Sequence, residues 1–136
     1  MNVGLVGLKG HQGVVLGELR EAGCRLAAVC EDNAEALAGV PSWPSANPQT
    51  KTYDSFEAML DNEQLDVVCE AGTDNLRGGI IRACAERGIH VICEKPLAFT
   101  LDELALVRDF NADATNFGEG EAPNAEVAAL LNKALA

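Results

Sequence analysis

The chain has 136 residues, of which 48% are hydrophobic, and a formal net charge of −11. This length suits one compact domain with its own core. The strong negative charge argues against nucleic acid and anionic membranes as partners. The apolar runs are too short to span a bilayer, and the first residues lack the pattern of a secretory signal peptide.

The five cysteines are Cys24, Cys30, Cys69, Cys84 and Cys93. Their spacing contains no C-x-x-C pair and no cysteine–histidine zinc pattern, so no metal site is predicted. Three of them lie inside apolar runs, where a free cysteine behaves as a small hydrophobic residue. The odd count and the absence of a signal peptide predict a reducing compartment, the cytoplasm.

Short apolar runs, typical of strands, alternate along the chain with amphipathic stretches, typical of helices. We expect strands at residues 3–6, 26–30, 52–53, 67–71 and 89–93, and helices at residues 12–22, 34–38, 54–60, 75–87 and 100–109. The pairs Asp54 with Glu57 and Thr100 with Glu103 have capping-box spacing at two helix starts.

Strands that are apolar throughout and separated by helices indicate a parallel sheet covered on both faces. Right-handed crossovers then predict an α/β fold: a doubly wound, mostly parallel sheet of the Rossmann type, with five strands in the order 3-2-1-4-5. This domain is expected to cover residues 1–110. Residues 111–136 are expected to form a polar tail with a short C-terminal helix, because Val127, Leu130 and Leu131 share one helical face.

A glycine-rich turn, with Gly7, Gly10 and Gly13 spaced as G-x-x-G-x-x-G, lies between the first predicted strand and helix. Glycines allow a tight turn and a close approach to a pyrophosphate, and the following helix offers N–H groups to it. Lys9 stands where the usual G-x-G-x-x-G pattern has its second glycine. The alternative is a structural turn in an α/β domain that binds no nucleotide.

Glu31 follows the second predicted strand at about the distance from the turn expected of a ribose-binding acid. A carboxylate there accepts hydrogen bonds from both adenosine ribose hydroxyls and repels a 2′-phosphate, which predicts NAD rather than NADP. The alternative is a solvated acid in an acid-rich chain, as Asp32 beside it illustrates.

Lys9 and His11 are the cationic candidates beside a bound pyrophosphate. Each has a second interpretation: Lys9 as a solvated loop lysine, and His11 as a hydrogen-bonding partner of the loop backbone. His90 begins the fifth strand and is expected to be structural.

Glu94-Lys95-Pro96 follows the fifth predicted strand directly. Because ligands of doubly wound sheets lie outside the carboxyl ends of the strands, Lys95 is expected at the ligand edge. There it can hydrogen-bond a substrate hydroxyl or assist removal of its proton during hydride transfer. The bond before Pro96 can be cis where the turn is sharp.

Three segments together resemble the Gfo/Idh/MocA family of sugar and polyol dehydrogenases. They are V-G-L-V-G with the glycine turn (residues 3–13), V-C-E-D (29–32) and G-I-H-V-I-C-E-K-P-L-A (88–98), the last followed by T-L-D-E-L (100–104). The resemblance covers residues 2–109. It implies an NAD(P)-binding domain, with the lysine of E-K-P beside the nicotinamide and the substrate.

Carried over to this chain, the resemblance implies that Lys95 acts in catalysis. The cofactor-binding residues are then expected to be Gly7, Lys9, Gly10, His11, Gln12, Gly13, Glu31, Gly72, Thr73, Asp74, Glu94, Lys95 and Pro96. The chain departs from the family pattern at Lys9 and over residues 72–77, where T-P-N-x-x-H is replaced by G-T-D-N-L-R. It also ends where the family's sixth strand and substrate domain are expected to begin.

Three hypotheses follow from the sequence. The first is the cofactor domain of an NAD-dependent oxidoreductase that acts on a sugar or polyol, without turnover on its own. The second is a stand-alone nucleotide-binding or oligomerisation module, and the third is a Rossmann remnant that acts only in protein interaction. Because the fifth strand would be an open apolar edge, a homo-oligomer or a partner chain is expected.

Overall fold

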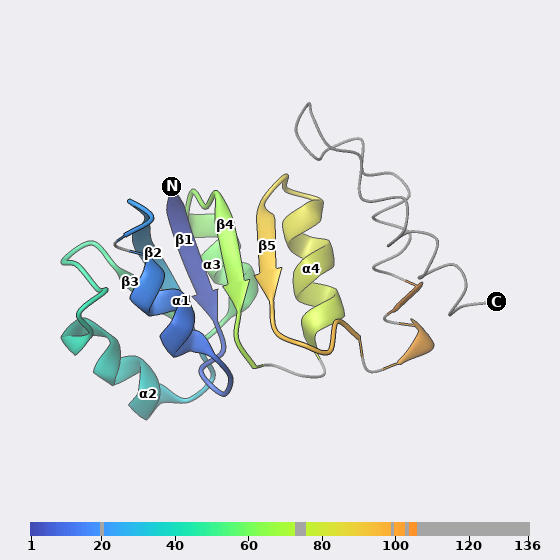
Figure 1. Cartoon of the computed structure of the whole chain (residues 1–136), viewed down its shortest axis with the longest axis horizontal. Coiled ribbons are helices and arrows are strands. Elements are labelled where there is room, and N and C mark those ends of the chain that lie inside the picture. The colour runs from blue at the N-terminus through green and yellow to red at the C-terminus, as the bar shows by residue number, and fades with distance from the viewer. Residues whose placement is uncertain (20, 73–75, 99, 103, 106–136) are drawn as a thin grey trace.

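The computed structural model describes residues 1–105 apart from residues 20, 73–75, 99 and 103 (Figure 1). The predicted polar tail at 111–136 therefore lies outside the described residues, as does part of the helix expected at 100–109. Among the described residues, no helix has both the length and the apolar character needed to cross a membrane.

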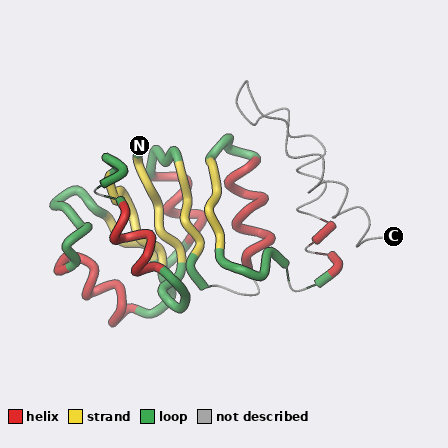
Figure 2. Tube along the Cα trace, viewed as in Figure 1, coloured by secondary structure: helices red, strands yellow, loops and turns green. Residues whose placement is uncertain are grey.

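Five parallel strands form one sheet at the centre of the domain (Figure 2). They are β1 (Asn2–Val6), β2 (Arg25–Cys30), β3 (Lys51–Tyr53), β4 (Val67–Glu70) and β5 (His90–Cys93), in the order β3-β2-β1-β4-β5. The predicted fold class and strand order are confirmed. Strands β1, β2 and β4 are nearly continuous buried runs, which is why the sequence shows no alternation in them.

The helices cover the two faces of the sheet as a doubly wound fold requires. They are α1 (Gln12–Glu18), α2 (Ala34–Gly39) with the 3₁₀ turn η1 (Val40–Ser42), α3 (Phe56–Asn62) and α4 (Arg77–Ala85). One core cluster joins Leu5 and Val29 of the sheet to α1, α2 and η1. The other joins Val6 and Val68 to Met59 of α3 and Ile80 of α4.

The helix boundaries differ from the sequence prediction in two informative places. Helix α3 is capped by Ser55 rather than by Asp54, because the Ser55 hydroxyl accepts the Ala58 N–H at 3.2 Å. The predicted capping box is therefore wrong by one residue. Helix α1 ends at Glu18 instead of continuing to residue 22.

All five cysteines are free, and Cys30, Cys69 and Cys84 are buried in the two core clusters. Burial raises the pKa of the Cys30 thiol to about 12, assisted by the Glu31 carboxylate. Burial likewise raises the pKa values of Cys69 and Cys84 to about 11. The folded domain therefore holds these three groups as neutral thiols.

We expect the free energy of unfolding to fall as the pH rises above about 9, where thiols of the unfolded chain begin to ionise. The folded state keeps these thiols protonated up to about pH 11–12, so stability is lost between about pH 9 and these higher values. Urea titrations at pH 7, 9 and 10 measure this loss of stability.

The burial of these three thiols also predicts their reactivity. In the folded chain at pH 8, iodoacetamide should modify half-buried Cys24 well before Cys30, Cys69 and Cys84. Equal rates would contradict their burial.

Candidate dinucleotide site

Four parallel strands bring their carboxyl ends to the same edge of the sheet. Val6 pairs with both Cys30 and Glu70, and Glu70 pairs with Cys93. The residues that follow these strands are the glycine turn, Glu31, the Ala71–Gly72 turn and Glu94-Lys95-Pro96. The structure thus brings together the segments that the sequence singled out, apart from Thr73 and Asp74, which lie outside the described residues.

The glycine turn packs against the end of β4. Gly7 has a φ of +77°, a backbone conformation that favours glycine, and it begins the turn. The backbone N–H groups of Lys9 and Gly10 both donate to the Ala71 carbonyl, at 3.1 and 2.9 Å. A Cβ on Gly72 would lie only 2.7 Å from the Gly10 nitrogen, so Gly72 permits this close contact between two backbone segments.

The Glu31 carboxylate is buried and hydrogen-bonded to the backbone of the glycine turn. Its side chain accepts hydrogen bonds from Leu8 N at 2.8 Å and Asn33 N at 3.2 Å, and the residue is only 5% exposed. Both carboxylate oxygens therefore already have a backbone donor, one in the glycine turn and one just before α2.

Asp32 is the exposed acid at this position, and the sequence reasoning passed over it. Its carboxylate lies 3.9 Å from the Lys9 ammonium, and both side chains are largely exposed. A hydrogen bond with Glu31, together with the charge of Lys9, lowers the pKa of Asp32. The spacing from the turn identified the end of β2 but did not distinguish the acid that holds the backbone from the acid that faces solvent.

His11 contacts Glu94 across the edge of the sheet. The His11 backbone N–H donates to Glu94 Oε1 at 2.8 Å, and the imidazole Nδ1 is hydrogen-bonded to the same oxygen. The interpretation that the His11 ring bonds the loop backbone is therefore wrong, because its partner is a carboxylate. Hydrogen bonding by the His11 N–H and ring lowers the pKa of Glu94 and keeps it ionised.

Lys95 is exposed, and its backbone N–H donates to Glu94 Oε2 at 3.2 Å. The Lys95–Pro96 peptide bond is cis, as the sequence allowed. Lys95 thus lies at the edge formed by the carboxyl ends of the strands and is exposed to solvent, whereas the Glu94 carboxylate beside it contacts His11 of the glycine turn.

A buried ion pair lies directly beneath this turn, and the sequence analysis did not anticipate it. Glu70 and Arg77 are 2% and 1% exposed, and Arg77 Nε donates to Glu70 Oε2 at 2.5 Å. The same guanidinium donates through Nη1 to the Pro96 carbonyl. The available signal was a glutamate closing an apolar strand and an arginine where the family pattern has histidine, since charges buried in a core occur in pairs.

The residues at this edge are chemically suited to a dinucleotide. The backbone of Gly13 is open, since a Cβ there would meet no atom within 4 Å, and the Lys9 ammonium supplies positive charge nearby. The buried Oε1 of Gln12 has no hydrogen-bond partner among the described residues, while its Nε2 donates to Leu8 O. A pyrophosphate approaching the turn would compete with the Glu94 carboxylate for the His11 N–H.

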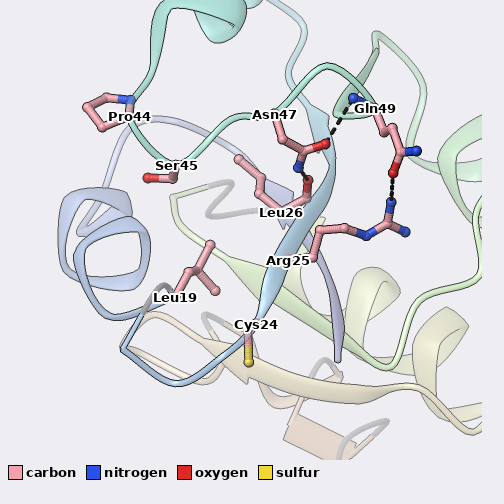
Figure 3. Close-up of a pocket in the computed structure, with 8 residues that line it drawn as sticks. All are labelled: Leu19, Cys24, Arg25, Leu26, Pro44, Ser45, Asn47 and Gln49. Atoms are coloured by element: carbon pink, nitrogen blue, oxygen red, sulfur yellow. Dashed lines mark hydrogen bonds between the residues drawn. The ribbon is translucent and has the colours of Figure 1, made fainter.

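A hollow of about 440 Å³ lies at the opposite edge of the sheet, beside the start of β2 (Figure 3). Its polar side chains already have partners: Asn47 Nδ2 donates to the Leu26 backbone carbonyl, and Arg25 Nη1 donates to Gln49 Oε1 at 2.9 Å. These bonds hold the loop before β3 against β2. The hollow is a packing feature far from the carboxyl ends of the strands, where ligands of this fold bind.

Within the described part of the chain, no group of three or more histidine, cysteine, aspartate or glutamate side chains is placed to hold a metal ion. The chemistry of this edge rests on backbone amides, carboxylates and the ammonium groups of Lys9 and Lys95.

Residues 1–115 match the Gfo/Idh/MocA family, described as an oxidoreductase family with an NAD-binding Rossmann fold. The chain belongs to this family. The match spans the whole described fold and includes the glycine turn and the E-K-P segment, so the resemblance noted in the sequence is confirmed.

Relatives within the Gfo/Idh/MocA family are sugar-acting enzymes. The chain is 40% identical over 84 residues to D-xylose 1-dehydrogenase (NADP(+)) 2 of Haloferax volcanii, which covers 62% of this chain and 24% of that protein. It is 34% identical over 86 residues to D-apiose dehydrogenase of Paraburkholderia graminis, covering 62% and 22%. The chain therefore spans about a quarter of the length of these relatives.

Solved structures show the same fold. Scyllo-inositol dehydrogenase from Lactobacillus casei, crystallised with NAD(H) and scyllo-inositol, superposes with a TM-score of 0.72 at 17% identity, over 82% of this chain and 33% of that chain. A dehydrogenase from Chromobacterium violaceum gives a TM-score of 0.71 at 28% identity, over 82% and 32%. This chain is thus an NAD-binding Rossmann domain of the Gfo/Idh/MocA family.

Proposed function

We propose that this chain is the cofactor domain of an NAD-dependent dehydrogenase acting on a sugar or polyol. The observation that supports this most is the convergence of the glycine turn, the Glu31-Asp32 acids and Glu94-Lys95-Pro96 at one edge of the sheet. A bound nicotinamide would supply the hydride acceptor. The chain's residues would hold the pyrophosphate at Gly10–Gly13 and orient the substrate hydroxyl near Lys95.

We expect NADH to bind about tenfold or more tightly than NADPH, a difference of about 1.4 kcal/mol. A 2′-phosphate at the end of β2 would face the carboxylates of Glu31 and Asp32, and Lys9, which pairs with Asp32, would offset only part of their charge. Titration calorimetry with both nucleotides tests this, and equal or tighter binding of NADPH would refute it. The NADP-dependent name of the Haloferax relative makes the comparison informative.

Two variants separate the roles of the acids. Asp32→Asn keeps the shape of the exposed side chain and should narrow the NADH preference without altering the fold. Glu31→Ala should also narrow it, but it removes the acceptor of Leu8 N and Asn33 N and should lower the melting temperature as well. If neither variant changes the preference for NADH over NADPH, the acids at the end of β2 do not contact the adenosine ribose.

The supporting observation for an oligomer is the exposed edge of the sheet. Strand β5 has no neighbour on its outer side among the described residues, and Ile92 within it is 60% exposed. An open apolar edge favours pairing with another chain. We expect a homodimer by light scattering and a monomer for Ile92→Lys; a wild-type monomer would refute the oligomer.

We also propose the cytoplasm as the compartment of this domain. The supporting observation is that all five cysteines are free, with three of them in the core as thiols. Oxidising compartments favour disulfides in small domains, and this fold contains none.

A further inference from the structure

The buried Arg77 reaches the Glu94-Lys95-Pro96 turn from the start of α4. The turn begins in the sheet, because Glu94 N donates to Glu70 O at 3.0 Å and continues the pairing of β4 with β5. It leaves the sheet at Lys95 and Pro96, which are both exposed. There Arg77 Nη1 donates a hydrogen bond from the interior of the domain to the Pro96 carbonyl.

The guanidinium is itself fixed by Glu70. Arg77 Nε donates to Glu70 Oε2 at 2.5 Å, and Nη2 lies 3.4 Å from Glu70 Oε1. Glu70 Oε1 also accepts the Gly72 N–H at 2.9 Å. One carboxylate therefore joins the β4–α4 turn, which packs on the glycine turn, to the arginine that holds Pro96.

We propose that Glu70 and Arg77 are positioning residues that set where Lys95 stands relative to the glycine turn. The inference rests on the proposed function, because Lys95 matters only if a cofactor and a substrate bind at this edge. Arginine suits this role because its planar group donates in several fixed directions at once, whereas a lysine ammonium behaves as a point charge on a flexible stem. The pair also explains how the chain accommodates its departure from the family pattern at residue 77.

The test uses Arg77→Lys, which keeps a positive charge opposite Glu70 but loses the forked contact to Pro96. Arg77→Met is the more obvious variant, but it leaves Glu70 buried without its cation and is expected to unfold the domain. Arg82→Lys is the matched control, because Arg82 of the same helix makes an exposed ion pair with Glu86, the residue that caps its C-terminus. Each protein is studied at a temperature where it is fully folded.

Amide hydrogen exchange, followed by NMR, reports the local effect without any nucleotide. In Arg77→Lys we expect the Glu94 amide to exchange about tenfold faster, while the Cys84 amide in α4 keeps its wild-type rate. A merely structural role of Arg77 in α4 would instead accelerate exchange throughout that helix. An unchanged rate at Glu94, or equal acceleration at Glu94 and Cys84, would overturn the proposal.

Titration with NADH gives the second readout. We expect the Kd to rise about tenfold in Arg77→Lys and to stay at the wild-type value in Arg82→Lys. Wild-type affinity in Arg77→Lys would overturn the proposal. If the wild-type chain binds no NADH, the proposed function fails, and the exchange rates at Glu94 still decide whether Arg77 positions the turn.

Discussion

Replacing Gly72 with alanine is expected to destabilise the domain by about 2–6 kcal/mol. Gly72 has a φ of +119°, and strained backbone conformations of this kind cost other residues about 1–3 kcal/mol. A Cβ at this position would also lie 2.7 Å from Gly10 N and 2.9 Å from the Lys9 carbonyl carbon. Relieving such overpacking costs a further 1–3 kcal/mol or so, because both neighbours are backbone atoms that cannot rotate away.

Gly23 provides the matched control for this substitution. Its φ is +65°, but a Cβ there would meet no atom within 4 Å. Gly23→Ala should therefore carry only the conformational cost, about 1–2 kcal/mol. Urea denaturation of both variants gives the difference, and equal losses would show that the contact with the glycine turn is unimportant.

The Gly72→Ala substitution should also weaken nucleotide binding, by more than its effect on stability suggests. Moving Gly72 away from Gly10 breaks the bonds from Lys9 N and Gly10 N to the Ala71 carbonyl, which set the path of the glycine turn. We expect NADH binding to be lost in Gly72→Ala at temperatures where the protein is folded, and to be retained in Gly23→Ala. Binding by folded Gly72→Ala would mean that the turn tolerates this shift.

The sheet could be predicted from the sequence because its strands carry strong local signals. Runs such as V-V-C-E at β4 are buried from Val68 onwards, and right-handed crossovers leave few possible orders for five such strands. The start of α3 could not be placed as well, because Asp54 and Ser55 are both good caps and adjacent in sequence. Only the backbone at Ser55 decides between them.

The location of the candidate site could also be predicted, since the carboxyl ends of parallel strands meet at one edge. The partners of its side chains could not. The bond between His11 and Glu94 joins residues 83 positions apart, and Arg77 reaches Pro96 from another element. Spacing within a motif contains no information about such contacts. It predicts Glu31 beside a ribose but does not reveal that its carboxylate also accepts the Leu8 and Asn33 N–H groups.

We expect the 136-residue chain to bind NAD without measurable dehydrogenase turnover. Hydride transfer needs a substrate held over the nicotinamide and a group that accepts the hydroxyl proton. Lys95 is exposed at the edge of the sheet, and the contacts of the described residues around it fix its backbone but build no enclosure above it. On the side that the described residues leave open, a ligand beside Lys95 would contact water, so much of the roughly 7–11 kcal/mol that positioning can contribute would be lost.

Steady-state production of NADH with a panel of aldoses and polyols measures this directly. General acid–base catalysis contributes only about 10²–10⁴-fold even in a well-formed site, so Lys95 acting alone should leave the rate at background. The control is Lys51→Ala, because Lys51 is an exposed lysine on β3 that pairs with Glu63. The rates of Lys95→Ala and Lys51→Ala should both equal the wild-type background rate. Robust turnover that disappears in Lys95→Ala and persists in Lys51→Ala would refute this expectation. It would mean that a second copy of the chain supplies the walls of the site.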